Sequence, residues 1–141
     1  MAETLHMAEV GDAIPGYTTK PITRTTLALF AGASGDHNPI HIDIDFAKKA
    51  GMDDVFAQGM LPMAYLGRLL TDWVPQTAIR QFSCRFSAIT HLGEKINCSG
   101  KITEKWEDGG ETLVKLALTA ANDAGEVKLA GAAVVALPAK N

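Results

Sequence analysis

The segment from Met60 to Trp73 is apolar on nearly every face of the helix that its composition favours. A helix that is apolar all round has to be buried. Pro62 is tolerated in such a helix only in the first turn. The rest of the chain must therefore supply the material that wraps this segment.

Four later segments alternate apolar and polar residues, and this pattern predicts strands with one buried face each. They cover residues 82–86, 96–102, 114–120 and 127–137. The sequences Asp108-Gly109-Gly110 and Asn122-Asp123-Ala124-Gly125 predict the turns that join the last three as antiparallel neighbours. Gly131, inside the final strand, predicts a bulge or a kink there.

The first third of the chain predicts smaller elements. Residues 1–11 are poorly patterned and are expected to form a loosely ordered arm, and residues 16–21 predict a short strand. Threonines 23, 25 and 26 are N-cap candidates for a helix that ends at Gly35. Asp43 or Asp45 caps a short helix that Gly51 stops.

Together these elements predict an α+β fold with one antiparallel sheet wrapped around a central buried helix, which is a hot-dog architecture. The 141 residues suit a single domain over 1–141. A sheet of about five strands leaves an edge strand and one end of the core uncovered. We therefore expect a homodimer or a higher homo-oligomer.

Composition excludes several function classes. The net charge is −3, and no cluster of lysine and arginine forms a basic stripe, which argues against nucleic acid as a partner. Apolar runs end well before the ~20 residues of a membrane span, and the first residues carry no signal pattern. We expect a cytoplasmic protein with no membrane partner, and Cys84 and Cys98 as reduced core thiols.

Polar chemistry is concentrated between Gly35 and His41. Pro39 prevents a regular helix here, so Asp36 and His41 are expected on a tight turn that brings their side chains together. Such a pair can transfer protons. Taken singly, Asp36 is better explained as an Asx-turn or helix-cap residue, and His41 as a buried core histidine. An acid, two histidines and an amide within six residues favour a site.

The run Gly35-Asp36-x-Asn38-Pro39-Ile40-His41, followed by an alanine-containing short helix and then Ala57-x-Gly59-Met60, resembles the hydratase motif of the MaoC-like (R)-specific enoyl-CoA hydratases and 3-hydroxyacyl-thioester dehydratases. The likeness extends over residues 23–137. It implies the hot-dog fold, an acyl thioester of coenzyme A or acyl-carrier protein as substrate, and no cofactor.

The resemblance also implies site residues. Asp36 and His41 are the catalytic pair, Asn38 supports them, and the backbone N–H of Gly59 provides an oxyanion contact. The position of Gly59 just before the buried helix agrees with that role, because unpaired N–H groups and the positive end of the helix dipole meet there. The family commonly has histidine where this chain has Gln58, and glutamine cannot titrate.

Other polar residues are weaker candidates. His37 and His91 are expected at the surface, and His6 in the arm. Asp36, His37, His41 and Asp43 are chemically suited to a metal, but a metal-free mechanism suffices, so no metal is predicted. Arg68 and Arg85 are candidates for coenzyme phosphates, and Met63 and Tyr65 for the border of an acyl pocket.

Two alternatives stay open. Hot-dog thioesterases place an acidic residue on or near the central helix, where this chain offers Asp72 near the far end. A non-catalytic subunit of a heteromeric dehydratase is the other alternative, although such a subunit has no use for Asp36 and His41.

Overall fold

The computed structural model describes residues 5 and 7–139, and within them five strands form one antiparallel sheet in the order β1-β3-β4-β5-β2. The strands are β1 (Tyr17–Thr18), β2 (Ile79–Phe86), β3 (Asn97–Asp108), β4 (Glu111–Ala121) and β5 (Val127–Leu137). The helices are α1 (Arg24–Ser34), α2 (Ile44–Lys49) and α3 (Met60–Thr71), with 3₁₀ turns η2 (Pro39–His41) and η3 (Gln76–Ala78). This order confirms the predicted α+β hot-dog fold.

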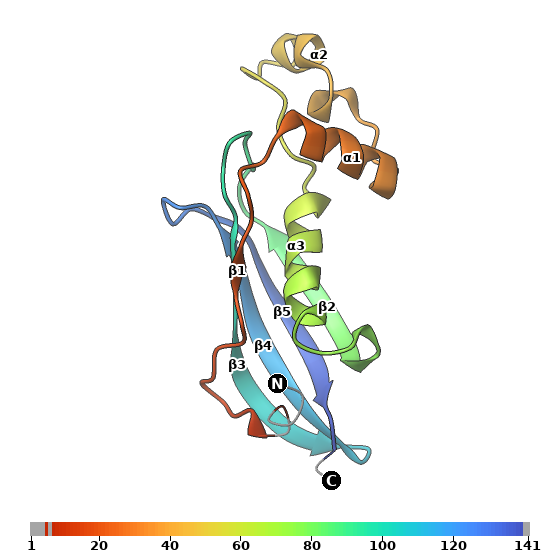
Figure 1. Cartoon of the computed structure of the whole chain (residues 1–141), viewed down its shortest axis with the longest axis vertical. Helices are drawn as coiled ribbons and strands as arrows, with labels where there is room; N and C mark the ends of the chain where they lie inside the picture. Colours follow the sequence, from red (N-terminus) through yellow and green to blue (C-terminus); the bar gives the residue numbers. More distant parts are fainter. Residues whose placement is uncertain (1–4, 6, 140–141) are drawn as a thin grey trace.

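Helix α3 lies along one face of the curved sheet, and α1 and α2 lie beyond one end of it (Figure 1). Leu66, Leu69 and Leu70 have no exposed surface and pack into the core that the sheet forms. Pro62 lies in the first turn of the helix, as its missing N–H requires. Apolar burial along α3 is therefore the main contact between the helices and the sheet.

Among the residues that the structure describes, none covers the opposite face of α3, which corrects the prediction of a helix buried on all sides. Met60, Ala64 and Arg68 are spaced four residues apart and are exposed. Residues four apart share one face of a helix, and a single sheet covers only the other face. The apolar composition of the segment therefore exceeds what one chain buries.

Gly131 lies in regular pairing with Cys84 of β2, so the predicted bulge or kink is wrong at this position. A different structural feature explains why residue 131 is a glycine. A Cβ placed on residue 131 would lie 2.8 Å from the carbonyl oxygen of Ser83 and 2.9 Å from Sγ of Cys84. The backbones of β2 and β5 approach too closely for a side chain.

We expect Gly131→Ala to lower the free energy of unfolding by about 1–3 kcal/mol, because the added methyl group forces β2 away from β5. Gly32→Ala is the matched control, since nothing lies within 4 Å of a Cβ at residue 32 in α1. That change should be neutral or raise the stability by up to about 1 kcal/mol. Urea unfolding of both variants measures the difference, and equal stabilities would contradict the steric argument.

Part of the expected N-terminal arm is attached to the sheet. The N–H of Gly11 donates to the carbonyl of Ile102 at 2.8 Å, and Nζ of Lys105 donates to the carbonyl of Ala8 at 2.9 Å. Residues 1–4 and 6 lie outside the described residues. Within the described ranges, no helix is both long enough and apolar enough to cross a membrane.

The two cysteines are free thiols, as predicted. Cys98 on β3 is buried and Cys84 on β2 is half-buried. Burial raises the pKa of the Cys98 thiol to about 11 and also raises the pKa of Cys84. Both side chains are therefore neutral near pH 7.

Candidate active site

Helix α1 places Asp36 just beyond its C-terminus. Thr23 caps the start of the helix, where its hydroxyl accepts from the N–H of Thr26 at 3.1 Å. Gly35 ends the helix with a left-handed φ of 78°, which glycine adopts without strain. Both caps agree with the sequence prediction, and together they turn the chain sharply into the segment that carries Asp36.

The next residues form the compact turn η2. Oδ1 of Asn38 accepts from the N–H of Ile40 at 3.1 Å, and the N–H of Asn38 donates to Oδ1 of Asp36 at 3.3 Å. Pro39 occupies the first position of the turn. The Asn38 side chain thus shapes the turn that connects Asp36 with His41, and it is exposed itself.

His41 is held by the backbone of a distant residue. The residue is 8% exposed, and Nδ1 of its ring lies 2.8 Å from the carbonyl oxygen of Phe56. A carbonyl only accepts, so Nδ1 carries the hydrogen and donates it. The ring of Phe56 packs edge-on against the imidazole, with centroids 5.1 Å apart at 87°. These contacts fix both the tautomer and the orientation of His41.

The free nitrogen of this imidazole faces the carboxylate. Nε2 of His41 lies 3.7 Å from Oδ2 of Asp36, whose side chain is 39% exposed. The separation exceeds the roughly 2.7–3.2 Å of a direct hydrogen bond. In the neutral ring Nε2 has a lone pair, so both groups can accept from the same water molecule. This arrangement suits transfer of protons to and from a small ligand.

Gly59 lines a cavity of about 350 Å³ at the start of α3. Pro62 of α3 and Phe86 of β2 also line it, and the Phe86 ring lies 3.3 Å from where a Cβ on residue 59 would stand. N–H groups at the start of a helix have no partner within the helix. The cavity therefore places an apolar surface beside a backbone donor.

Asp36 and His41 do not belong to the lining of this cavity, and Phe56 connects the two regions. Its backbone oxygen holds His41, and the same residue lines the cavity with Gly59. The structure therefore brings Asp36 and His41 together directly, whereas Gly59 lies on the cavity wall three residues after Phe56. Met63 and Tyr65 are not among the residues that line the cavity.

Gln58 is fully buried between this segment and α1. Its Nε2 donates to the carbonyl of Leu27 at 3.0 Å. The side chain thus links the start of α3 to the helix that leads to Asp36. A neutral amide fills this position, so Gln58 contributes a fixed contact and no titrating group.

The remaining candidates lie elsewhere. His37 and His91 are exposed, as predicted, and Oδ1 of Asp43 caps α2 by accepting from the N–H of Asp45 at 2.9 Å. His6 lies outside the described residues. Among the residues with a described position, no three acidic, cysteine or histidine side chains are grouped to hold a metal ion.

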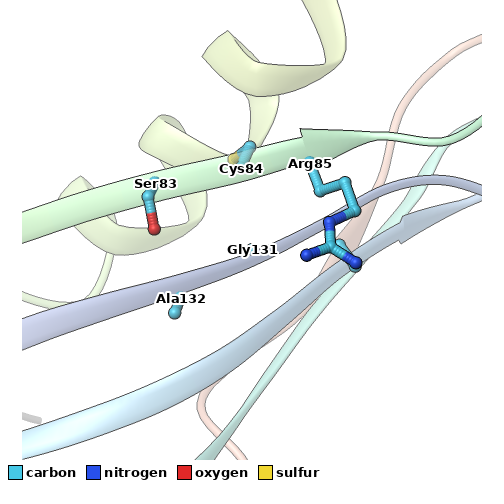
Figure 2. A pocket seen from close by; sticks show the side chains of 6 residues that line it. Ser83, Cys84, Arg85, Gly131 and Ala132 are labelled. Atoms are coloured by element: carbon cyan, nitrogen blue, oxygen red, sulfur yellow. The ribbon is translucent and has the colours of Figure 1, made fainter.

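Neither candidate arginine lines the cavity beside Gly59. Arg68 lies over the ring of Tyr17, 4.9 Å from its centroid, and 3.5 Å from Asp72. Arg85 lines a separate hollow of about 380 Å³ across β2 and β5, where its guanidinium points toward Gly131 (Figure 2). This second hollow contains none of the predicted catalytic residues.

A family model described as a MaoC like domain matches residues 7–123. This chain belongs to the MaoC-like family. The (R)-specific enoyl-CoA hydratase of Rhodospirillum rubrum is 27% identical to it over 124 residues, which cover 86% of this chain and 83% of that enzyme. These matches agree with the resemblance that the Asp36 to Met60 motif predicts.

Two further similar proteins extend the comparison. The peroxisomal multifunctional enzyme type 2 of Mus musculus is 26% identical over 134 residues, which cover 90% of this chain but 17% of that enzyme. The chain thus corresponds to a small part of the mouse protein. The unliganded R-hydratase of Pseudomonas aeruginosa superposes with a TM-score of 0.83 at 28% identity, over 95% of this chain and 84% of that one.

Two parts of this candidate site were not predicted from the sequence. Phe56 acts through its carbonyl oxygen, a group that every residue has, so no sequence signal marks it. The loop of residues 87–90 lines the cavity although it lies thirty residues beyond Gly59. Only the folded sheet brings that loop beside the start of α3.

Proposed function

We propose that this MaoC-like protein is an (R)-specific enoyl-CoA hydratase or 3-hydroxyacyl-thioester dehydratase that acts reversibly and without a cofactor. The supporting observation is the pairing of Asp36 with His41. The carboxylate oxygen lies 3.7 Å from Nε2, while Phe56 holds Nδ1 as the hydrogen-bearing nitrogen. The named hydratases among its relatives agree with this assignment.

In the hydration direction, Asp36 and His41 bind one water molecule between them. One of the two groups accepts a proton from this water as its oxygen bonds to C3 of the enoyl thioester. The C2–C3 double bond supplies the electrons that form the enolate. The proton taken from water is then returned by the pair to C2 from the same side, so the hydrogen and the hydroxyl add to one face. Dehydration reverses each step.

Gly59 stabilises the enolate oxygen in this proposal. Its N–H group lies at the start of α3, where the helix dipole favours negative charge. A preorganised donor of this kind contributes most where water is excluded. Asn38 supports the pair by capping the turn between Asp36 and His41.

The substrate is an acyl thioester carried by coenzyme A or by acyl-carrier protein, and its apolar chain enters the cavity beside Gly59. We also propose one MaoC-like domain over 1–141 that forms a homodimer or a higher homo-oligomer. The uncovered face of α3 and the edge strand β2 support this, as do the exposed side chains of Met60, Phe86 and Ile89 around the cavity. A cytoplasmic location stays a prediction.

Hydration of a short trans-2-enoyl-CoA by the purified full chain tests the function. We expect loss of the enoyl absorbance and formation of the (R)-3-hydroxyacyl-CoA, followed across a series of chain lengths. Release of free thiol from a saturated acyl-CoA would instead indicate a thioesterase. Activity that arises only on mixing with a second chain would indicate a subunit of a heteromeric dehydratase.

The structure gives little support to the thioesterase alternative. Asp72, the acidic residue that this alternative requires, follows the last turn of α3 and is exposed. Its carboxylate lies near the guanidinium of Arg68 and away from the cavity lining.

A further inference from the structure

We propose that Lys128 is a positioning residue of the proposed hydratase site, and that it acts by holding the loop of residues 87–91 against the segment that carries Phe56 and Gly59. This inference rests on the proposed function. Lys128 lies on β5, and its side chain has no exposed surface. Its ammonium does not line the cavity, so any effect on the reaction passes through the residues that it holds.

The ammonium of Lys128 has three partners. Nζ donates to the carbonyl of Ile89 at 2.8 Å and lies 3.0 Å from Oε1 of Glu94. It also pairs with the carboxylate of Glu126. A buried ammonium is costly unless it is paired and hydrogen-bonded, and this set provides both kinds of contact.

These partners keep Lys128 charged. Burial alone lowers the pKa of a lysine, but the bonds to Glu126 and Glu94 outweigh it and raise the pKa of Lys128. Desolvation raises the pKa of Glu94. Hydrogen bonds from the N–H of His91, the amide of Asn122 and the ammonium of Lys128 outweigh this effect and lower the pKa. The ion pair is therefore present throughout the neutral pH range.

Lys128 and Glu94 bind the loop at several points along its length. The carbonyl of Lys128 accepts from the N–H of Ser87 at 2.9 Å and from that of Ala88 at 3.3 Å. Its ammonium holds Ile89, and Oε1 of Glu94 accepts from the N–H of His91 at 2.7 Å. Four loop residues are thus hydrogen-bonded to the side chains of Lys128 and Glu94 or to the backbone of β5.

The held loop in turn positions the proposed site. The carbonyl of Thr90 accepts from the N–H of Ala57 at 2.9 Å, and His91 forms a β-bridge with Phe56. The carbonyl of Phe56 then fixes His41, and three residues further along the chain Gly59 is the N-cap of α3. One continuous series of contacts runs from Lys128 to both the imidazole and the proposed oxyanion donor.

The loop also forms one wall of the cavity, since Ser87, Ala88, Ile89 and Thr90 line it together with Gly59. A shift of this loop changes the wall and the position of Phe56 at the same time. Displacement of reacting groups by about 1 Å can cost about 10²-fold in rate. Lys128 is therefore placed to influence turnover without touching the substrate.

Lys128→Met in the full chain tests the inference, because methionine is similar in length and lacks the ammonium. Lys105→Met is the matched control: Lys105 also binds one carbonyl and one carboxylate, those of Ala8 and Glu9, but on a different part of the sheet. Glu94→Ala is the second variant, used where Lys128→Met does not fold. It frees the N–H of His91 and leaves Lys128 bound to Ile89.

Two readouts are needed for each variant: amide hydrogen exchange at Ala57 and residues 87–91, and kcat and KM for a short enoyl-CoA. In Lys128→Met we expect faster exchange at these amides and a fall in kcat of at least tenfold, up to about 100-fold, in the folded protein. Glu94→Ala should also speed exchange at these amides and lower kcat, but by smaller factors. Lys105→Met should leave both unchanged.

Unchanged exchange at Ala57 in Lys128→Met, or in Glu94→Ala where that variant replaces it, would overturn the inference. Faster exchange together with a kcat within about threefold of the wild-type value would also overturn the inference. Loss of a lysine with a purely structural role lowers the stability but leaves the turnover of each folded molecule unchanged. A wild-type protein without hydratase activity would refute the proposed function instead. Hydrogen exchange alone would then show whether Lys128 positions the segment of residues 56–59.

Discussion

Replacing His41 by alanine, or Asp36 by asparagine, is expected to lower kcat/KM for enoyl-thioester hydration by about 10²- to 10⁴-fold, the usual contribution of a positioned acid or base. His41→Ala removes the nitrogen that faces the carboxylate across 3.7 Å. Asp36→Asn keeps the shape of the side chain and removes its charge. Because both groups act on one water molecule, the double variant should lose little more than either single variant.

His37→Ala is the matched control for these two changes. His37 lies inside the same turn but is exposed and has no place in the proposed mechanism. Its activity should stay within about threefold of the wild-type value. Circular dichroism and thermal unfolding show whether each variant keeps the fold. Near-normal turnover in folded His41→Ala and Asp36→Asn proteins would refute the assignment of the site.

Leu66→Ala is expected to lower the free energy of unfolding by about 2–5 kcal/mol. Leu66 lies in the middle of α3, has no exposed surface and packs in the core beneath the sheet. Its truncation removes apolar contact and leaves a cavity that the neighbouring strands cannot fill, because strong pairing along β3, β4 and β5 resists their movement.

Leu29→Ala is the comparison for this prediction. Leu29 on α1 is 70% exposed, so the same substitution should change stability by no more than about 0.5 kcal/mol. Urea unfolding of both variants gives the two free energies, and an unchanged denaturant slope shows that the unfolded states are comparable. A loss below about 1 kcal/mol in Leu66→Ala would mean that α3 is not the centre of the core.

The periodicity of the chain predicted most of the elements. Alternating residues such as Phe82 and Cys84 indicated β2, and the continuous apolar run from Met60 indicated α3. Gly35 marked the end of α1 correctly, and its start is at Thr23, one of the three predicted N-cap candidates, because caps depend on residues within one helical turn. The meeting of Asp36 and His41 was also predictable, since they are five positions apart with Pro39 between them.

Other predictions from the same patterns were less accurate. Gly131 suggested a bulge, but the glycine accommodates the backbone of β2, and nothing in β5 alone shows how close that strand lies. The composition of α3 suggested burial on every side, whereas Met60, Ala64 and Arg68 are exposed in the single chain. Composition does not tell whether the chain itself or a second copy covers a face.

By itself the sequence determined the order of the elements, their caps and the local turn that joins Asp36 to His41, because each depends on side chains a few residues apart. Only the tertiary structure decided that the carbonyl of Phe56 orients His41 and that Lys128 holds the loop beside Gly59. Backbone carbonyls are chemically the same at every position. Which of them meets a distant side chain is therefore set by the packing of the sheet and its helix.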